Sequence, residues 1–446
     1  MQLITHISYL SALAMMAMST FANADPTANP LFQINTLRDS YQGAFTVSHT
    51  RDGDFEFTTA YAEGRIAYNP RNNSVFIDSH VYKNAIIEFR IPSYLSKNLD
   101  NLPEGERLTD FFEILDNTST GNTQNIDRLG AFALIKNDLY VQAYEYYDAD
   151  TSVTDTTLVL RGADNNLSST ADGFFQMQGG AETVSYISPI PQEWQSILKG
   201  EYLAGSGSGF PINTRSSFGP SLYTFNPNEV TGKSSGTITT TLWQSYDLAN
   251  ALSTSLYTYA SDNNGNWDGY NQTGQQNNFA EGQSNNLWTE ASSAWFGFIP
   301  SGTRTFVVLG QSGMHESGGA YKATQTDGNV CGGPCSFDPN DNYSYYWLYD
   351  LNDIVNAANP YEVIPYDYGE FDNSFGDGGI HTGYPSGGSY DPETGTLYLL
   401  MKSGTGINGA ADPIIAVYQL GSTKKNNLML IPVVDLLLDE DDSKTE

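Results

Sequence analysis

The feature that most constrains the fold of this chain is a two-strand pattern that recurs along it. Each copy consists of an apolar strand, a short turn rich in Asn, Asp or Gly, and a second apolar strand. Such a pattern predicts a β-hairpin, because these turn residues adopt the backbone angles that tight turns need. The copies occupy residues 65–80, 129–144, 295–310 and 388–402. Hairpins that recur at long, fairly even spacing predict a β-propeller.

Further apolar segments extend the hairpins toward four-stranded blades. After three of the hairpins, the third and fourth strands are predicted at residues 85–92 and 105–114, 156–161 and 173–177, and 345–350 and 361–366. Only one further strand, at residues 413–420, is predicted after the last hairpin. We therefore expect residues 43–48 to supply the missing strand and to close the ring without a free sheet edge.

The remaining copy is the least regular. Its inner strand is predicted at residues 217–225, followed by a strand at 238–243, and the one convincing helix is predicted at 191–198. The abundance of Tyr, Phe, Gly, Ser, Thr and Asn is typical of an all-β protein with many turns. The sequence thus predicts an all-β fold, a β-propeller of five four-stranded blades, with six or seven blades as the alternative.

The chain divides into four predicted parts. Residues 1–24 contain an apolar stretch that ends in Ala22-Asn23-Ala24, which indicates a secretory signal peptide cleaved before Asp25. We expect a flexible leader at 25–42, a single propeller domain at 43–421, and an acidic, flexible tail at 422–446. The predicted location is therefore the periplasm or the outside of the cell.

Charge and motifs narrow the classes of partner and chemistry. The chain has 51 acidic and 20 basic side chains, for a formal net charge of −31, which disfavours nucleic acid and anionic membranes as partners. No apolar run after residue 24 approaches the ~18 residues that cross a bilayer, so no membrane insertion is expected. A Gly-rich phosphate loop, a Gly-x-Ser-x-Gly elbow and a His-Glu-x-x-His helix are also missing from the sequence, which argues against nucleotide-dependent, serine-hydrolase and zincin chemistry.

The two cysteines, Cys331 and Cys335, lie four positions apart. In an exported protein a short disulfide is the expected state of such a pair. The alternative is a metal site that uses both thiolates and His315, although no second cysteine pair is present to complete four ligands.

The chain resembles a family of exported bacterial proteins over most of its length after the signal peptide. The resemblance is carried by residues 65–80, 190–194, 215–220 and 345–353. It implies a propeller fold. It implies no activity that could be transferred to individual residues.

Aligning the hairpins by their turns brings scattered cationic and aromatic residues to one predicted face. In a propeller, the loop that enters the inner strand and the loop that leaves the second strand open on the same face, where ligands commonly bind. The residues predicted there are Arg65, His80, Arg128, Tyr144, Arg215, His315, His381 and Lys402. In so acidic a chain, this grouping predicts a pocket for an anionic group such as a uronate, sulfate or phosphate.

The residue types suggest a division of roles. Arg binds carboxylates and sulfates through paired hydrogen bonds, while His and Tyr exchange protons. We assign catalysis to His80, Tyr144 and His315, and substrate binding to Arg65, Arg128, Arg215, His381 and Lys402. The alternative for each residue is structural, with Arg pairing to carboxylates between blades and His capping turns.

These residue types are similar to those of the propeller polysaccharide lyases. That similarity implies a mechanism in which a cation neutralises a uronate carboxylate and a Tyr or His base removes the neighbouring C–H proton. The predicted function is therefore an exported propeller that binds, and in one version cleaves, an anionic extracellular polysaccharide. The alternative is a non-catalytic propeller that recognises protein or glycan.

Carboxylates and metal ions give weaker signals. A glycosidase would need two opposed carboxylates, and Glu63, Asp78, Glu145, Glu290 and Glu316 are the candidates within reach of the predicted face. No cofactor is required by the predicted function. Calcium is the one candidate ion, at an alternation of oxygen ligands that departs from the EF-hand pattern and consists of Asp262, Asn264, Asn266 and Asp268.

Overall fold

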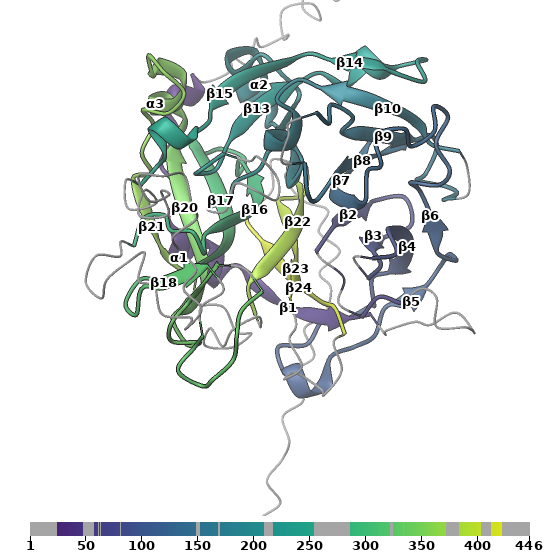
Figure 1. Cartoon of the computed structure of the whole chain (residues 1–446). Coiled ribbons are helices and arrows are strands. Elements are labelled where there is room, and N and C mark those ends of the chain that lie inside the picture. Colours follow the sequence, from purple (N-terminus) through teal and green to yellow (C-terminus); the bar gives the residue numbers. More distant parts are fainter. Residues whose placement is uncertain are drawn as a thin grey trace, which may run out of the picture.

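The computed structural model describes residues 25–47, 58–60, 62, 64–80, 82–148, 152–167, 170–208, 217–253, 286–321, 324–332, 334–371, 383–402 and 412–421. Within these residues, five sheets stand in a ring around a common axis (Figure 1). Neighbouring inner strands contact one another all the way around the ring. The fold is a five-bladed β-propeller, and the prediction of an all-β propeller with five blades is confirmed.

Blades 1 and 2 both start with a predicted hairpin next to the axis. From the axis outward, blade 1 consists of β2 (Ile66–Asn69), β3 (Ser74–Asp78), β4 (Ala85–Arg90) and an outer strand divided into β5 (Glu106–Arg107) and β6 (Phe112–Glu113). Blade 2 consists of β7 (Arg128–Ile135), β8 (Asp138–Tyr144), β9 (Thr157–Leu160) and β10 (Asp172–Met177), and β14 (Gly236–Ile238) pairs with β10 in parallel.

Blades 3 and 4 carry the helices between their strands. Blade 3 consists of β11 (Tyr186–Pro189), β12 (Tyr202–Gly205), β13 (Leu222–Phe225) and β15 (Thr240–Gln244), with α2 (Gln192–Leu198) between the first two strands. Blade 4 consists of β16 (Ser293–Phe298), β17 (Thr305–Gly313), β20 (Asn342–Asp350) and β21 (Asp367–Glu370), with the β18 (Gly319–Tyr321) and β19 (Pro334–Ser336) pair before β20 and α3 (Leu351–Asn356) after it.

Blade 5 joins the two ends of the propeller. Its strands are β22 (Pro385–Asp391), β23 (Thr396–Met401), β24 (Ile414–Gln419) and the early strand β1 (Tyr41–Thr46). β1 pairs antiparallel with β24, from Tyr41 opposite Tyr418 to Thr46 opposite Ile414. An early strand thus completes the last blade, as predicted, and the backbone groups of β24 that would otherwise form a free edge are paired.

The turns of the four predicted hairpins share one backbone feature. Each contains a residue with positive φ, namely Asn73 (48°), Lys136 (59°), Gly302 (73°) and Gly395 (74°). Gly adopts this left-handed region without steric cost, and Asn adopts it more readily than most residues. In three of the four hairpins the local signal therefore has a direct structural cause, whereas in blade 2 the positive φ falls on Lys136.

Three inner strands are irregular near their first residues. The register shifts between Leu129 and Phe132 in β7, between Ala294 and Phe296 in β16, and between Pro385 and Gly387 in β22. At two of these bulges a glycine lets the next blade approach. A Cβ on Gly130 would lie 2.2 Å from Val184 O, and a Cβ on Gly387 would lie 1.5 Å from Gly64 O. Adjacent blades are therefore in backbone contact at this end of the axis.

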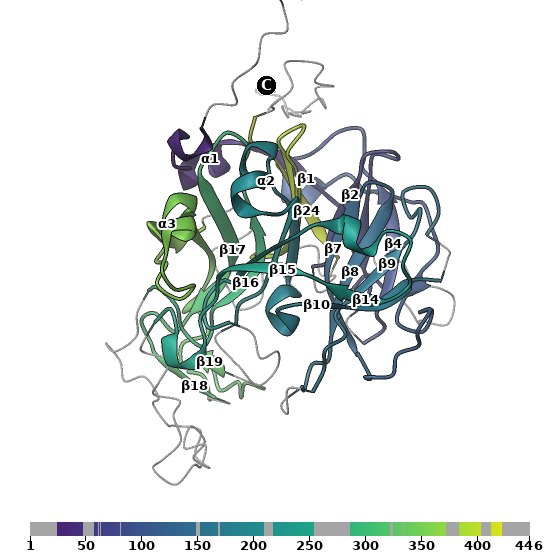
Figure 2. The same ribbon diagram turned by 90° about the horizontal axis from the view of Figure 1, so that it is seen from above.

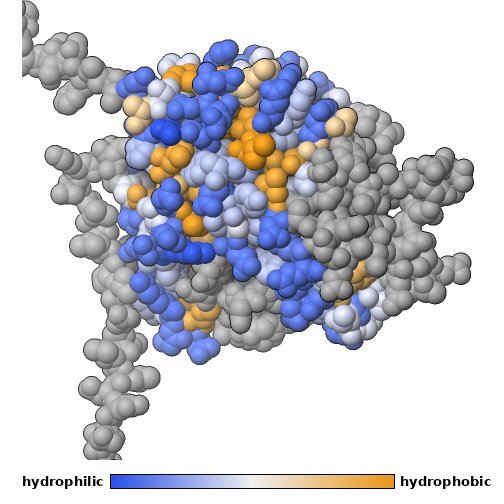
Figure 3. Space-filling model, turned by 90° about the vertical axis from the view of Figure 1, so that its left-hand side faces the viewer, coloured by the Kyte–Doolittle hydropathy of each residue, from blue (hydrophilic) through white to orange (hydrophobic). Residues whose placement is uncertain are grey.

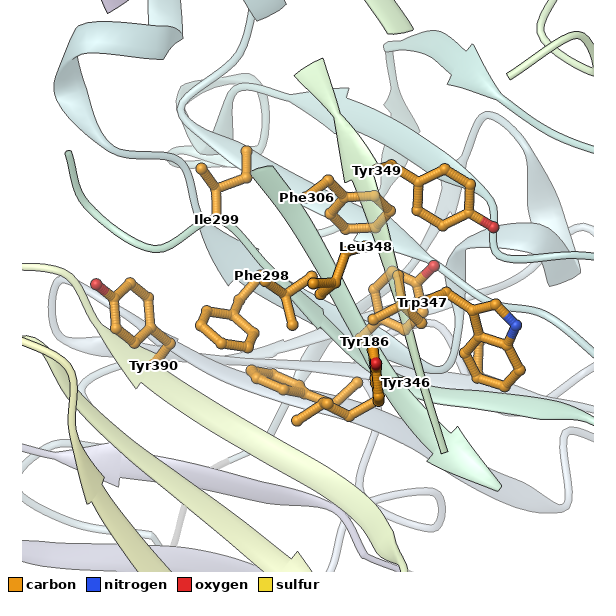
Figure 4. Packing of buried hydrophobic residues seen from close by; sticks show 14 of the residues in the cluster. Tyr186, Phe298, Ile299, Phe306, Tyr346, Trp347, Leu348, Tyr349 and Tyr390 are labelled. Carbon is orange, nitrogen blue, oxygen red and sulfur yellow. The ribbon is translucent and has the colours of Figure 1, made fainter. Parts of the chain in front are cut away.

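The largest hydrophobic cluster lies between blades 3, 4 and 5. It includes Trp194, Trp288 and Trp347, which are fully buried, and the ring of Phe298 lies 5.0 Å from that of Tyr390 across the boundary between blades 4 and 5 (Figure 4). Burying a side chain of this size contributes roughly 1.5–3 kcal/mol. Inter-blade aromatic packing of this kind stabilises the ring.

Blade 3 does not have the strands that the sequence predicted. Residues 222–225 form its third strand, β13, and the inner strand is β11. The second predicted strand, 238–243, is divided between β14, which joins blade 2, and β15. The prediction of an inner strand at 217–225 was wrong because α2 separates β11 from β12, so this blade lacks the tight hairpin turn used to find the others. The predicted helix at 191–198 is present as α2.

One further strand in blade 4 was misplaced. Residues 361–366 were predicted as its fourth strand, but that strand is β21. Asp350 ends β20 and caps α3 by accepting a hydrogen bond from Asn352 N at 2.9 Å, so the chain turns away from the sheet before it returns. Tyr366 N then donates to Leu348 O at 2.8 Å, at the start of the pairing between β21 and β20.

The residues before β1 belong to the folded structure. A flexible leader was expected at 25–42, whereas the structure has a short 3-10 helix (Pro26–Ala28) and α1 (Ile34–Asp39) there. Leu37 is fully buried, and Arg304 N donates to Pro30 O at 3.1 Å. The other 3-10 helices in the described residues are Leu99–Asn101, Gly180–Thr183, Pro227–Val230 and Leu248–Asn250.

The propeller has two faces, which we name by the direction of the inner strands. The inner strands begin at the proximal face and end at the distal face. Figure 2 shows α1 and α2 on the distal side and β18 and β19 on the opposite, proximal side. On the side of the molecule seen in Figure 3, hydrophilic residues predominate and hydrophobic ones are interspersed. None of the helices in the described residues is long and apolar enough to cross a membrane.

Candidate functional site

Arg65 stands directly before β2 and reaches across the axis at the proximal face. Its side chain is buried, with the residue 7% exposed. Nε donates to Leu129 O at 2.9 Å, Nη2 lies 3.5 Å from the Tyr144 hydroxyl, and the guanidinium carbon lies 5.9 Å from the ring centre of Trp295. The side chain of a blade 1 residue therefore contacts blades 2 and 4.

Arg128, the first residue of β7, is held between aromatic rings. Its guanidinium carbon lies 5.3 Å from the ring centre of Tyr82 and 5.1 Å from that of Tyr146. Nη1 donates to Asp127 O at 2.8 Å and forms a salt bridge with the Asp127 carboxylate at 3.1 Å. An Arg stacked on aromatic faces loses little side-chain freedom when it binds a ligand.

His80 lies next to Tyr82 at the end of the first hairpin. Their ring centres are 5.3 Å apart, and Tyr82 N donates to His80 Nδ1 at 3.3 Å. Because Nδ1 accepts this hydrogen bond, the neutral ring carries its proton on Nε2. His80 and Arg128 thus both contact the ring of Tyr82.

These contacts join four of the predicted residues into one group. Arg128 and Tyr144 are opposite each other in the pairing of β7 with β8, which connects the Arg65 contacts to the Arg128 contacts. We call the group the proximal cluster, and it consists of Arg65, His80, Tyr82, Arg128, Tyr144, Tyr146 and Trp295. Arg side chains can form charged hydrogen bonds to an anion, and Tyr and His side chains can exchange protons.

The aromatic members Tyr82, Tyr146 and Trp295 were not singled out from the sequence. Tyr82 and Tyr146 each lie two residues after a residue that was, His80 and Tyr144. Trp295 begins the predicted hairpin of blade 4, so its place near the axis followed from the alignment. Its indole Nε1 is buried and has no hydrogen-bond partner among the described residues.

His315 lies in blade 4 within its own set of contacts. Nε2 is 2.8 Å from Ser312 Oγ, which is in turn 2.7 Å from Ser292 Oγ, and the His315 ring stacks on Tyr343 with centres 5.0 Å apart. Burial lowers the pKa of His315 to about 4, and the nearby Asp341 carboxylate offsets only part of that effect. The imidazole is therefore neutral at neutral pH.

Asp341 fixes the loop that carries His315. Its carboxylate accepts hydrogen bonds from the backbone N–H groups of His315, Glu316 and Ser317, at 2.9, 3.1 and 2.7 Å. The Ser317 hydroxyl also donates to it at 2.7 Å. A carboxylate that accepts several backbone N–H groups is well suited to fixing a loop, so the contacts around His315 fit a structural role as readily as a catalytic one.

Lys402 follows β23 at the proximal face of blade 5. Its ammonium group lies 6.0 Å from the ring centre of Tyr384, and its backbone N donates to Tyr384 O at 3.0 Å. Arg215, His381 and the four calcium candidates, Asp262, Asn264, Asn266 and Asp268, lie outside the described residues. Within the part of the chain that is described, no group of three or more His, Cys, Asp or Glu side chains is arranged to hold a metal ion.

Cys331 and Cys335 form a disulfide, with their Cα atoms 6.4 Å apart. Cys335 is in β19, which pairs with β18 on the proximal side of blade 4. Disulfide-bonded sulfurs are not available as thiolate ligands. In this structure the pair therefore closes a loop instead of binding a metal with His315.

Among the carboxylates named from the sequence, Glu290 has the most unusual surroundings. It lies three residues before β16 and is 5% exposed, and neither carboxylate oxygen has a hydrogen-bond partner among the described residues. Burial raises the pKa of Glu290 well above its ordinary value. Asp78, by contrast, accepts a hydrogen bond from Arg65 N at 3.3 Å. The two carboxylates thus differ in environment, but no contact joins Glu290 to the proximal cluster in the described residues.

The proximal cluster lies outside four of the cavities that described residues line. None of these four is lined by His80, Arg128 or His315. The structure therefore shows a proximal cluster of contacting side chains.

Comparisons with known proteins find a likeness among solved structures alone. No protein-family model matches the chain, and no curated protein matches its sequence. Among the solved structures that match is the catalytic domain of a GH62 α-L-arabinofuranosidase from Coprinopsis cinerea, with 8% sequence identity and a TM-score of 0.30 over 85% of this chain and 98% of that one. A TM-score of 0.30 is too low to support an argument about the fold or the activity of this chain.

Proposed function

We propose that this protein is exported and binds an anionic polysaccharide at its proximal face, with Arg65 and Arg128 contacting carboxylate or sulfate groups. One observation carries the proposal. In a chain of net charge −31, two scarce arginines lie at the starts of inner strands of neighbouring blades, and each contacts two aromatic residues. Arg provides charge and paired hydrogen bonds, and aromatic faces contact the C–H groups of sugar rings.

Binding is measured by calorimetry with a uronic-acid polysaccharide, and with a neutral polysaccharide for comparison. Arg128→Ala is expected to weaken binding of the uronic-acid polymer about tenfold or more, since a hydrogen bond to a charged group is worth about 1.5–3 kcal/mol. Arg128→Lys keeps the charge but loses the planar fork, so an intermediate loss is expected.

Arg90→Ala is the matched control. Arg90 is half-exposed on the outside of blade 1, where it pairs with Glu106 at 2.9 Å, so its loss changes the net charge equally without touching the proximal cluster. Equal effects of Arg128→Ala and Arg90→Ala would show that charge alone attracts the polymer, and the proposed site would be abandoned.

The same cluster holds the groups that β-elimination needs. In that reaction an Arg would neutralise the uronate carboxylate, and Tyr144 or His80 would remove the proton α to it. The bond to the leaving sugar oxygen breaks, that oxygen takes up a proton, and the new chain end carries a C=C bond. Tyr144→Phe keeps the ring and removes the hydroxyl, so the unsaturated product, followed by its ultraviolet absorbance, should disappear in this variant if Tyr144 is the base.

The outcome of this assay separates the two forms of the proposal. Product formed by the wild-type protein and lost in Tyr144→Phe or His80→Ala, with binding retained, supports a lyase. Binding without product on any anionic polysaccharide tested rules out the lyase and leaves a recognition protein.

A further inference from the structure

A separate cavity opens at the distal end of the axis. Its volume is about 690 Å³, and residues from the inner strands or inner hairpins of all five blades line it. Tyr68 comes from blade 1, Leu134 from blade 2, Ile187 from blade 3, Ser301 from blade 4 and Asp391 from blade 5. A volume of this size is in the range of small-molecule binding sites.

Two half-buried tyrosines provide fixed walls. The Tyr68 ring stacks on Tyr398 with centres 4.8 Å apart, and the Tyr202 ring packs on Phe225 at 6.0 Å. Burial, and to a lesser extent the neighbouring Glu201 carboxylate, raise the pKa of Tyr202 to about 12, so its hydroxyl keeps its proton and can donate a hydrogen bond. Rings that are held in place present an apolar face without a large loss of side-chain freedom.

The charges of this cavity are opposite to those of the proximal cluster. Four carboxylate side chains line it, those of Glu193, Glu201, Asp391 and Glu393, against a single cation, Lys136. Lys136 is exposed and lies 3.3 Å from Asn228 Oδ1. Three of these carboxylates form no salt bridge within the described residues, namely those of Glu193, Glu201 and Asp391. The cavity therefore favours a positively charged ligand.

The cavity continues along α2. A second cavity of about 660 Å³ shares Gln192, Glu193, Gln195 and Glu201 with the first. It extends as far as Pro26 and Asn226, and Lys199 also lines it. The two carboxylates of this shared set lie at the junction. An extended ligand with more than one ring therefore fits the site better than a single compact amine.

We propose that the distal cavity binds an oligosaccharide of amino sugars, with an ammonium group at the Glu193 and Glu201 carboxylates and a sugar ring against Tyr68 or Tyr202. The sugar ring supplies an apolar C–H face for the tyrosines, and its hydroxyl groups donate to carboxylate oxygens. This site is independent of the proximal cluster, since it lies at the opposite end of the axis.

The test compares two ligands that differ in charge. Glucosamine oligomers with free amines and the same oligomers with N-acetylated amines are titrated into the full-length protein by calorimetry, at about pH 6 so that the free amines are protonated. The free-amine oligomer is expected to bind at least about tenfold more tightly, because an ammonium–carboxylate contact is roughly twice as strong as a neutral hydrogen bond.

Variants locate the site. Glu201→Gln is expected to weaken binding of the free-amine oligomer about tenfold, and Lys136→Gln, which removes the one cation that lines the first cavity, to strengthen it by about two- to threefold. Glu106→Gln is the matched control for the charge change, since Glu106 is exposed on the outside of blade 1 and paired with Arg90. Its binding should equal that of the wild type.

Three results would overturn the proposal. They are equal affinity for the acetylated oligomer, equal weakening by Glu201→Gln and Glu106→Gln, and no measurable binding of the free-amine oligomer to wild-type protein whose fold is intact by circular dichroism. The proximal site is judged separately, because Arg128→Ala should leave binding of the free-amine oligomer unchanged and Glu201→Gln should leave binding of the uronic-acid polymer unchanged.

Discussion

The proximal and distal ends of the axis are built by the same inner strands but differ in charge. At the proximal end, β2 begins directly after Arg65 and β7 begins at Arg128. These two arginines are flanked by Tyr82, Tyr146 and Trp295. At the distal end, the same strands lead into a cavity lined by four carboxylates and Lys136. Both ends carry aromatic side chains. The proximal end carries arginines, whereas the distal end carries mainly carboxylates.

This difference shows how a propeller separates its scaffold from its sites. The middle of each inner strand packs against its neighbours, so its residues are constrained by the core. The residues at the two strand ends meet other blades only through side chains and short loops, so each end is free to carry its own chemistry. The two proposed ligands, one anionic and one cationic, follow from that separation.

The largest expected effect comes from the backbone contact at the proximal end. Gly387→Ala places a Cβ 1.5 Å from Gly64 O, where no side chain can move aside. We expect this change to destabilise the protein by about 3–5 kcal/mol, in the range of severe overpacking in a core. Urea unfolding followed by circular dichroism measures the loss.

Gly302→Ala is the matched change at the distal end. Gly302 has φ 73° in the turn between β16 and β17, and a Cβ there would meet nothing within 4 Å. A loss of about 1 kcal/mol is expected from backbone strain alone. Similar losses in the two variants would contradict the tighter inter-blade contact at the proximal end.

Acid stability should depend on His315 at the proximal side. Its pKa is lowered from 6.5 to about 4, so the unfolded chain binds a proton in this interval that the folded protein does not bind. The free energy of unfolding should therefore fall by up to about 3 kcal/mol as the pH falls from 6.5 to about 4. His315→Gln, which does not titrate, should flatten this part of the profile.

Urea unfolding at a series of pH values checks this expectation, with Ser301→Ala at the distal end as a control that keeps the acid slope. A nuclear magnetic resonance titration in which His315 gains its proton near its ordinary pKa would contradict the burial that the structure shows.

The last expected effect is a gain of stability. Burial raises the pKa of Glu290, so the stability that its protonated form provides is lost as the pH rises through the folded-state pKa. Glu290→Gln should therefore exceed the wild type in stability by an amount that grows with pH, up to about 1–2 kcal/mol, the cost of leaving a buried polar group unpaired. Thermal unfolding at neutral and alkaline pH measures it, and a destabilised variant would indicate a partner for Glu290 in the folded protein.

Much of the fold could be predicted from the sequence because the signal is local. The hairpins of blades 1, 2, 4 and 5 were found from turns that contain Asn73, Lys136, Gly302 and Gly395, each at positive φ. Blade 3 was misread because its inner strand, β11, leads into α2 and not into a tight turn. Tight turns are a local signal, so they mark only the blades whose first two strands are joined by such a turn.

The candidate site was only partly predictable. Aligning the hairpins placed Arg65, His80, Arg128 and Tyr144 on one face, and the structure joins them through contacts. The alignment also placed His315 there, but its side chain is held by Ser312, Tyr343 and a loop fixed by Asp341. A position on a face follows from strand register, whereas the direction of a side chain depends on its neighbours from other blades.

The sequence by itself determined the hairpins of four blades, the closure by an early strand and the strongly acidic charge. These depend on turn residues, strand periodicity and composition, which are properties of short segments. Only the tertiary structure decided that Arg65 reaches Trp295 across the axis and that Tyr68, Tyr202 and four carboxylates enclose a distal cavity. Those residues are far apart in the chain, and they meet because the blades close into a ring.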